Sequence, residues 1–112
     1  MHDDDDKTKP LAVGLILTLD RTPQEVADLK TSIASRAIRE GYCLLNTYEA
    51  TVGNFESTID RLLVSVRAAR AALDNPRAVL LPTKGDLGTS GSARLETAER
   101  LDENDLVVVL LK

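Results

Sequence analysis

The sequence predicts an α/β fold, an open and mainly parallel sheet of about four strands with helices on both faces. Strand-like and helix-like segments alternate along the chain, which is typical of parallel strands joined by right-handed helical crossovers. The first strand-like segment is apolar at nearly every position instead of every second one, as expected for a strand covered on both faces. Capping residues and turn signals separate the segments, so their order can be followed from end to end.

The first seven residues account for most of the net charge. The chain has 112 residues and a formal net charge of −4. Residues 1–7 end in four aspartates and a lysine (DDDDK), the form of a protease-recognition site, so we interpret them as an expression leader. Without this leader, 14 acidic side chains face 13 basic ones and the net charge is −1. Residues 8–112 suffice for a single domain and lack the basic excess of proteins that bind nucleic acid without sequence preference.

Residues 11–19 (LAVGLILTL) form the first predicted strand, and a capped helix follows. Thr22 has the properties of a helix N-cap, with Pro23 at the first helical position and Glu25 placed to complete a capping box. Gly41 is placed to end this helix, because glycine readily adopts the left-handed backbone found there. One apolar stripe with helical spacing is expected to face the sheet: Val26, Leu29, Ile33 and Ala37.

A second strand and a second helix follow Gly41. Residues 42–48 (YCLLNTY) form a shorter and less apolar strand that we place near an edge of the sheet, and residues 49–54 form a loop. The helix starts at residue 55 and ends before Pro76, because the residue before a proline avoids the helical region. Its apolar side is expected to consist of Ile59, Leu62, Leu63, Val66 and Leu73.

The last third of the chain contains two more predicted strands, residues 78–81 and 106–111. Between them lie the turn-rich residues 82–92 (PTKGDLGTSGS) and a short helix over residues 93–103. Ligands of parallel sheets bind outside the carboxyl ends of the strands. The places to search for a site are therefore the segments that follow strands: residues 20–21, 49–54 and 82–92.

Several kinds of chemistry lack the residues they need. Cys43 is the single cysteine, so an internal disulfide framework and a cysteine-built zinc site are excluded. His2 belongs to the leader, so the body has no histidine for a metal site or a serine–histidine triad. We expect Cys43 to be a buried, inert thiol, and we expect no cofactor and no metal. No apolar run has the length of a membrane helix, and we expect a cytoplasmic protein without membrane contact.

The glycine-rich segment that leads into the third helix is a candidate anion-binding loop. Backbone N–H groups in such a turn, followed by a helix N-terminus, favour a phosphate. The segment does not match either the lysine-bearing phosphate loop or the dinucleotide fingerprint. A phosphate- or nucleotide-binding loop therefore stands beside a mobile surface loop as an alternative. The residues concerned are Gly88, Thr89, Ser90, Gly91 and Ser92.

Two further groups of charged residues have a functional and a simple interpretation. Lys84 and Asp86 follow the third strand, where a phosphoacceptor site would need them, but Asp20 stands alone after the first strand, and we expect Lys84 and Asp86 to be solvated turn residues. A strip of arginines could bind DNA weakly, although acidic residues interrupt it and a solvated helix face also explains it. The strip consists of Arg61, Arg67, Arg70 and Arg77.

Three segments, read together, resemble the resolvase-like catalytic domain of serine recombinases. They are residues 12–20 (AVGLILTLD), 36–42 (RAIREGY) and 77–81 (RAVLL) with 86–88 (DLG). The second segment contains the pattern A-x-x-x-G-Y, with which the family enters its second strand, and the first is similar to the family's AIGYIRVST. The resemblance spans residues 11–111 and implies a flavodoxin-type doubly wound sheet, the fold class that the patterning also predicts.

The same resemblance implies that the reaction is lost. The family's first strand ends in an arginine and, two residues on, the serine that attacks DNA; here Leu17 and Leu19 stand at those positions. The arginines of the later Asp-Arg-Leu-Gly-Arg signature fall on Asp86 and Thr89, and a one-residue slip, which puts Thr18 in the serine's place, does not restore them. We therefore expect no catalytic residue. The expected role is that of an interaction, regulatory or self-association module whose partner is a protein or a second copy, with DNA contact made through a longer parent protein.

Overall fold

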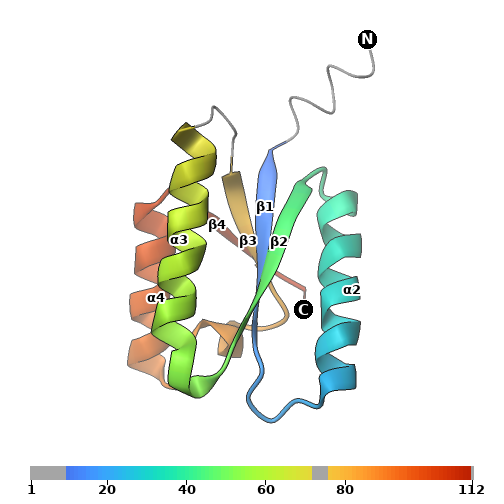
Figure 1. Cartoon of the computed structure of the whole chain (residues 1–112), viewed down its shortest axis with the longest axis vertical. Coiled ribbons are helices and arrows are strands. Elements are labelled where there is room, and N and C mark those ends of the chain that lie inside the picture. Colours follow the sequence, from blue (N-terminus) through green and yellow to red (C-terminus); the bar gives the residue numbers. More distant parts are fainter. Residues whose placement is uncertain (1–9, 72–75, 112) are drawn as a thin grey trace.

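Four parallel strands form one sheet with the order β2-β1-β3-β4 in the computed structural model, which describes residues 10–71 and 76–111 (Figure 1). The elements are β1 (Leu11–Leu17), α2 (Pro23–Arg39), β2 (Cys43–Ala50), the 3₁₀ helix η1 (Val52–Asn54), α3 (Phe55–Ala71), β3 (Pro76–Leu81), the 3₁₀ helix η2 (Lys84–Leu87), α4 (Gly91–Glu103) and β4 (Val107–Leu110). The predicted α/β fold with a parallel sheet is confirmed. The predicted leader and Leu73 lie outside the described residues.

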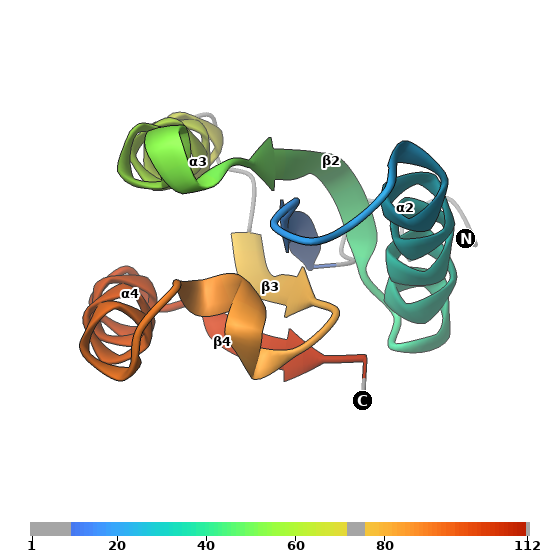
Figure 2. The same ribbon diagram turned by 90° about the horizontal axis from the view of Figure 1, so that it is seen from below.

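Helices cover both faces of the sheet, as predicted. Helix α2 lies on one face, and α3 and α4 lie together on the other (Figure 2). Alternate residues of β1 supply the two cores, because successive side chains of a strand point to opposite faces. Val13 and Leu15 pack with apolar residues of α3 and α4, whereas Ala12 and Ile16 pack with the buried stripe of α2. The central strand is therefore apolar throughout because both of its faces are buried.

Both ends of α2 have the caps that the sequence predicts. The Thr22 hydroxyl accepts a hydrogen bond from the Glu25 N–H, and the Glu25 carboxylate accepts one from the Thr22 N–H. At the other end, Gly41 has a φ of 81°, its N–H donates to Ile38, and the Tyr42 N–H donates to the carbonyl of Ala37. This pair of bonds is a Schellman motif, which closes the helix and turns the chain into β2.

Gly14 allows α2 to approach the middle of β1. A Cβ atom at this position would lie 2.7 Å from Thr47 Oγ1 and 3.0 Å from Ile33 Cγ2. No real Cβ approaches a neighbour as closely as the first of these distances, so the space belongs to the neighbours from β2 and α2. The close packing of these neighbours therefore explains why a glycine occurs within this apolar strand.

The loops are more ordered than the sequence predicts. Strand β2 lies at the edge of the sheet, as expected, but it continues to Ala50, and η1 occupies the second half of the predicted loop at residues 49–54. Helix η2 lies within residues 82–92, and α4 starts at Gly91 with Ser90 as its N-cap. In the described part of the chain, no helix has both the length and the apolar character that crossing a bilayer requires.

The prediction that Cys43 is buried is wrong. Cys43 is exposed, because it is the first residue of the edge strand β2, which has a strand neighbour on one side only. The apolar neighbours in the sequence suggested a fully covered strand, but most of β2 is exposed or only partly buried. An edge strand has one strand neighbour and less helix cover than β1, so apolar composition overstates its burial.

Candidate functional site

The carboxyl ends of β1 and β3 enclose the crevice where a doubly wound sheet would bind a ligand. The chain leaves β1 toward α2 on one face and leaves β3 toward α4 on the other, so the crossover direction changes between these two strands. Strand β3 pairs with β1 only as far as Gly14, whereas β1 continues to Leu17. The last residues of β1 therefore border the switch point of the sheet.

A charged pair, Arg21 with Asp86, fills this crevice. Arg21 Nη1 binds Asp86 Oδ1 at very short range, and Arg21 Nη2 lies 3.3 Å from Oδ2. The Asp86 side chain is only 1% exposed and that of Arg21 is 20% exposed. A carboxylate this deeply buried is stable only when donors surround it, and a guanidinium group is the donor that fits both of its oxygens.

The pair also makes the backbone hydrogen bonds at the end of β1 that a neighbouring strand would otherwise make. The Leu17 N–H donates to Asp86 Oδ1 at 2.9 Å, and the Leu17 carbonyl accepts from Arg21 Nη1 at 2.9 Å. These two backbone groups point to the side from which β3 has already departed. Buried backbone groups without partners are costly, so Arg21 and Asp86 complete the sheet where β3 does not reach.

Thr83 holds Asp86 in place. Asp86 is the third residue of η2, and its Oδ2 accepts hydrogen bonds from the Thr83 N–H at 3.0 Å and from the Thr83 hydroxyl at 3.1 Å. The prediction that Asp86 is a solvated turn residue is therefore wrong, whereas Lys84 is exposed as expected. A Thr-x-x-Asp capping pattern was the sequence signal for this arrangement. Nothing in the sequence indicated that Arg21 would meet Asp86.

The resemblance places the recombinase arginine and nucleophile at the carboxyl end of β1 and in the turn after it. Leu17 is buried, and Leu19 is 48% exposed in the turn after β1. The Thr18 hydroxyl donates to the carbonyl of Ala50 at 3.2 Å, and the Thr18 N–H donates to the same oxygen. Thr89, which aligns with one of the family's arginines, is exposed. The guanidinium of Arg21 is thus paired with a carboxylate, and the hydroxyls of Thr18 and Thr83 both donate hydrogen bonds within the fold.

The predicted anion-binding residues form the entry to α4. Ser90 accepts a hydrogen bond from the Ala93 N–H through its hydroxyl, and the carbonyl of Gly88 accepts one from Arg94. Gly88 has a φ of 153°, and a Cβ there would lie 3.0 Å from the Cβ of Ala93. The other three members, Thr89, Gly91 and Ser92, are exposed. Anion binding at this loop stays a prediction.

The four arginines of the predicted basic strip do not share one element. Arg61, Arg67 and Arg70 belong to α3, with the first two exposed and Arg70 partly buried, whereas Arg77 is exposed on β3. Asp60 stands next to Arg61 on the same helix. Weak DNA binding through this strip also stays a prediction.

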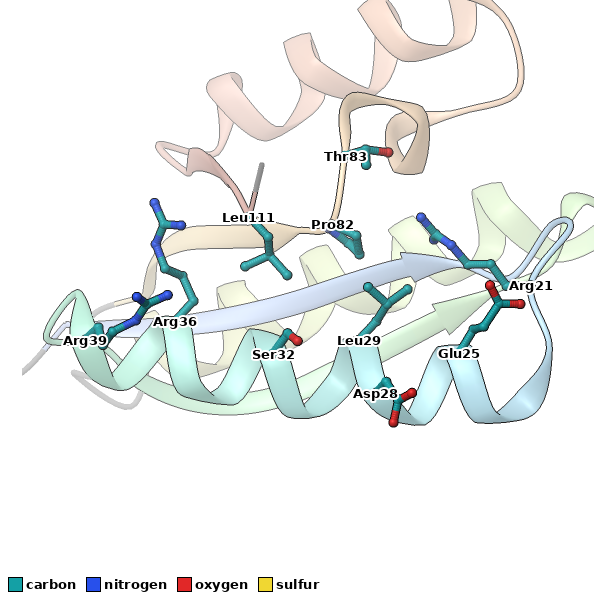
Figure 3. A pocket seen from close by; sticks show the side chains of 10 residues that line it. All are labelled: Arg21, Glu25, Asp28, Leu29, Ser32, Arg36, Arg39, Pro82, Thr83 and Leu111. Carbon is teal, nitrogen blue, oxygen red and sulfur yellow. The ribbon is translucent and has the colours of Figure 1, made fainter.

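A groove of about 540 Å³ runs along α2 beside the ends of β3 and β4 (Figure 3). Arg21 and Glu25 lie at one end and Arg36 and Arg39 at the other, and both apolar and polar side chains lie between them, Leu29 and Ser32 among them. The Thr22 N–H donates to the Glu25 carboxylate and lowers the pKa of Glu25; the Thr22 hydroxyl and the charge of Arg21 act in the same direction. The groove has charges of both signs, and in residues 10–71 and 76–111 no three metal-ligating side chains gather.

Comparison with known proteins finds a likeness in structure only. No protein family model matches the sequence, and no curated protein matches it significantly. The solved structures that match include the crystal structure of the C-terminal catalytic domain of ISC1926 TnpA, an IS607-like serine recombinase. The TM-score is 0.70 at 12% sequence identity, over 91% of this chain and 68% of that chain. The chain therefore has the resolvase-like α/β fold that its sequence resembles.

Proposed function

We propose that this resolvase-like domain carries out no recombination and acts as a protein-interaction, regulatory or self-association module of a DNA-linked protein. The observation that carries the proposal is the Arg21–Asp86 pair in the crevice at the switch point. The guanidinium that lies there is bound to a carboxylate and to the Leu17 carbonyl. It is therefore engaged within the fold and not presented to a phosphate.

The chemistry of strand cleavage gives the reason. Attack on a phosphodiester needs an activated hydroxyl and positive groups that stabilise the charge that develops on the phosphoryl oxygens. Leu19 has no hydroxyl, and the buried carboxylate of Asp86 adds negative charge where the family has an arginine. Thr18 is the remaining hydroxyl at the end of β1, and its bond to the Ala50 carbonyl directs it toward β2.

The recombinase named in the comparison supports the fold and no more, because the identity is 12%. A domain that keeps a fold without the reaction can still act through its surfaces. The proposed module role therefore depends on a partner, which a DNA assay and an association assay can test separately.

The reaction is tested by incubating the 112-residue chain with supercoiled plasmid and with linear duplex DNA. A denaturing gel detects covalent protein–DNA adducts, and an agarose gel detects nicking or a change of topology. An active serine recombinase with its own DNA site serves as the positive control. We expect neither adduct nor topological change. An adduct that Thr18→Ala abolishes would overturn the proposal and identify the slipped alignment as the correct one.

The same protein serves to test the two alternatives. If residues 88–92 bind phosphate or nucleotide, titration with either compound should shift the amide signals of that loop and few others. If Arg61, Arg67, Arg70 and Arg77 bind DNA, affinity for a labelled duplex should fall steeply as salt increases. A response in either assay would replace the interaction role with a binding function.

A further inference from the structure

We propose that β4 and α4 form a docking surface for a second copy of this chain, with the two β4 strands antiparallel across a two-fold axis. The proposal deepens the proposed function, because it names the partner and the surface of the module. It rests on the outer edge of β4, on the apolar groove beside it and on the distribution of charge along that groove.

The outer edge of β4 has no strand partner in the described part of the chain. Strand β4 pairs with β3 from Val107 to Leu110 and is the last strand of the sheet (Figure 2). Its four residues are Val-Val-Val-Leu, without charge or proline, and Val107 is 60% exposed. Uncharged apolar edges of this kind readily pair with another strand unless charge, proline or a bulge prevents it.

A groove of about 370 Å³ lies between α4 and β4, on the face of the sheet that α4 covers. Its apolar lining comes from Leu95 and Ala98 of α4, Val108 and Leu110 of β4, and Leu87 of η2. Leu95 is 62% exposed, although it belongs to the stripe of α4 that borders this groove. A second apolar surface that covers β4 would also bury Leu95, with a gain that follows the apolar area removed from water.

Charge is unevenly distributed along the groove. Helix α4 runs antiparallel to β4, so its first turn lies near the carboxyl end of the strand and its last turn near the amino end. Lys84 and Arg94 line the groove at the carboxyl end. Asp102 follows Leu95 by two helical turns on the same side of α4 and is exposed, and the exposed Asp105 precedes β4. The groove is therefore basic at one end, and the surface beyond its other end is acidic.

This distribution of charge favours a second copy of the chain as the partner, in an antiparallel orientation. In an antiparallel arrangement, the basic end of each copy meets the acidic end of the other. Lys84 and Arg94 of each copy then face Asp102 of the other copy. A parallel arrangement would bring like charges together. A two-fold interface must be complementary to itself, and the combined α4–β4 surface meets this requirement in both charge and apolar character.

Sedimentation velocity of the 112-residue chain tests the inference, with concentrations from about 5 to 500 µM, the range in which weak dimers dissociate. We expect a sedimentation coefficient that rises from the monomer value toward the dimer value. Val107→Lys should abolish this rise, because a charge then lies on the pairing edge. Val64→Lys is the matched control, since Val64 is 61% exposed on α3, away from β4.

A charge exchange tests the orientation. Lys84→Glu and Asp102→Lys should each raise the dissociation constant about tenfold, and the double variant should restore affinity because the opposite charges meet again. Arg61→Glu, an exposed change on α3, should have no effect. Circular dichroism spectra and melting curves establish that each variant is folded.

Three results would overturn the inference: a chain that stays monomeric throughout, equal effects of Val107→Lys and Val64→Lys, or no restoration in the double variant. These failures are distinct from failure of the proposed function. A monomeric chain that forms no DNA adduct removes only the docking surface. A chain that forms an adduct contradicts the absence of recombination whatever its oligomeric state.

Discussion

Replacing Asp86 with alanine removes the hydrogen-bond acceptors and the counter-charge that this carboxylate provides at the end of β1. The Leu17 N–H loses its acceptor, the Thr83 N–H and hydroxyl lose theirs, and Arg21 loses its counter-charge. Leu17 is buried, so water replaces the lost acceptor poorly. Arg21 and Thr83 are partly exposed and can recover some hydration.

The loss in free energy of unfolding can be worked from these partners. A buried donor left without an acceptor costs about 1–3 kcal/mol, and breaking a buried ion pair by removing one member costs about 3–5 kcal/mol. The partial exposure of Arg21 moves the sum toward its lower limit, so we expect Asp86→Ala to destabilise the domain by about 4 kcal/mol. Domains of this size are stable by roughly 5–15 kcal/mol, so such a loss is large.

Urea unfolding followed by far-ultraviolet circular dichroism measures this loss, because the chain has no tryptophan for fluorescence. Arg21→Met and the double variant Arg21→Met/Asp86→Ala complete a thermodynamic cycle. Each single change leaves a charge without its partner, so the double variant should be more stable than the sum of the single losses predicts, by about 1–2 kcal/mol. Asp60→Ala is the control, since Asp60 pairs with Arg100 on the surface, where such pairs contribute about 0–1 kcal/mol.

Two results would refute this reasoning. If Asp86→Ala costs no more than Asp60→Ala, the carboxylate does not hold the end of β1. If the single losses simply add, Arg21 and Asp86 are energetically independent despite their contact, and the pair cannot be the reason that the crevice is closed.

Two further changes test the packing and the capping of α2. Gly14→Ala should cost about 1–3 kcal/mol because its Cβ would overlap Thr47, and Thr47→Ala should recover part of the loss, whereas Gly53→Ala meets no neighbour and should leave the urea midpoint nearly unchanged. Glu25 has a lowered pKa in the folded state, so its charge stabilises the domain above the ordinary carboxylate pKa of about 4.3, and this contribution is lost as pH falls through the lower folded value. Glu25→Gln keeps the capping bond without the charge, so its deficit relative to the parent should be present at neutral pH and vanish in acid; a deficit independent of pH contradicts the assignment.

The fold was predictable because its strongest determinants are local. The capping box at Thr22 and Glu25, Gly41 at the end of α2 and the continuous apolar run of β1 each depend on residues close in sequence. The two cores then follow from the period of the apolar positions. Strand limits were less accurate at β2, where pairing with β1 and not composition decides that the strand continues to Ala50.

The site was not predictable, because its central contact joins residues 65 positions apart. Asp86 was expected in solvent because aspartate in a glycine-rich segment usually is, and only the three-dimensional path of η2 brings it beneath the end of β1. Cys43 differs in the opposite sense, because its apolar segment predicts burial whereas the residue lies on an edge strand and is exposed. Both errors have one cause: burial depends on which elements become neighbours.

Structural support and phosphoryl transfer make opposite demands on the crevice between β1 and β3. A recombination site needs cations that remain available for a phosphate, which costs stability while the site is empty. Here the available cation is bound to Asp86, and the same carboxylate satisfies the backbone of Leu17, so the charges complete the sheet. Under the proposed function, Leu19→Ser alone should give no covalent DNA adduct, because Arg21 would first have to leave Asp86, and the end of β1 would then lose its hydrogen-bond partners.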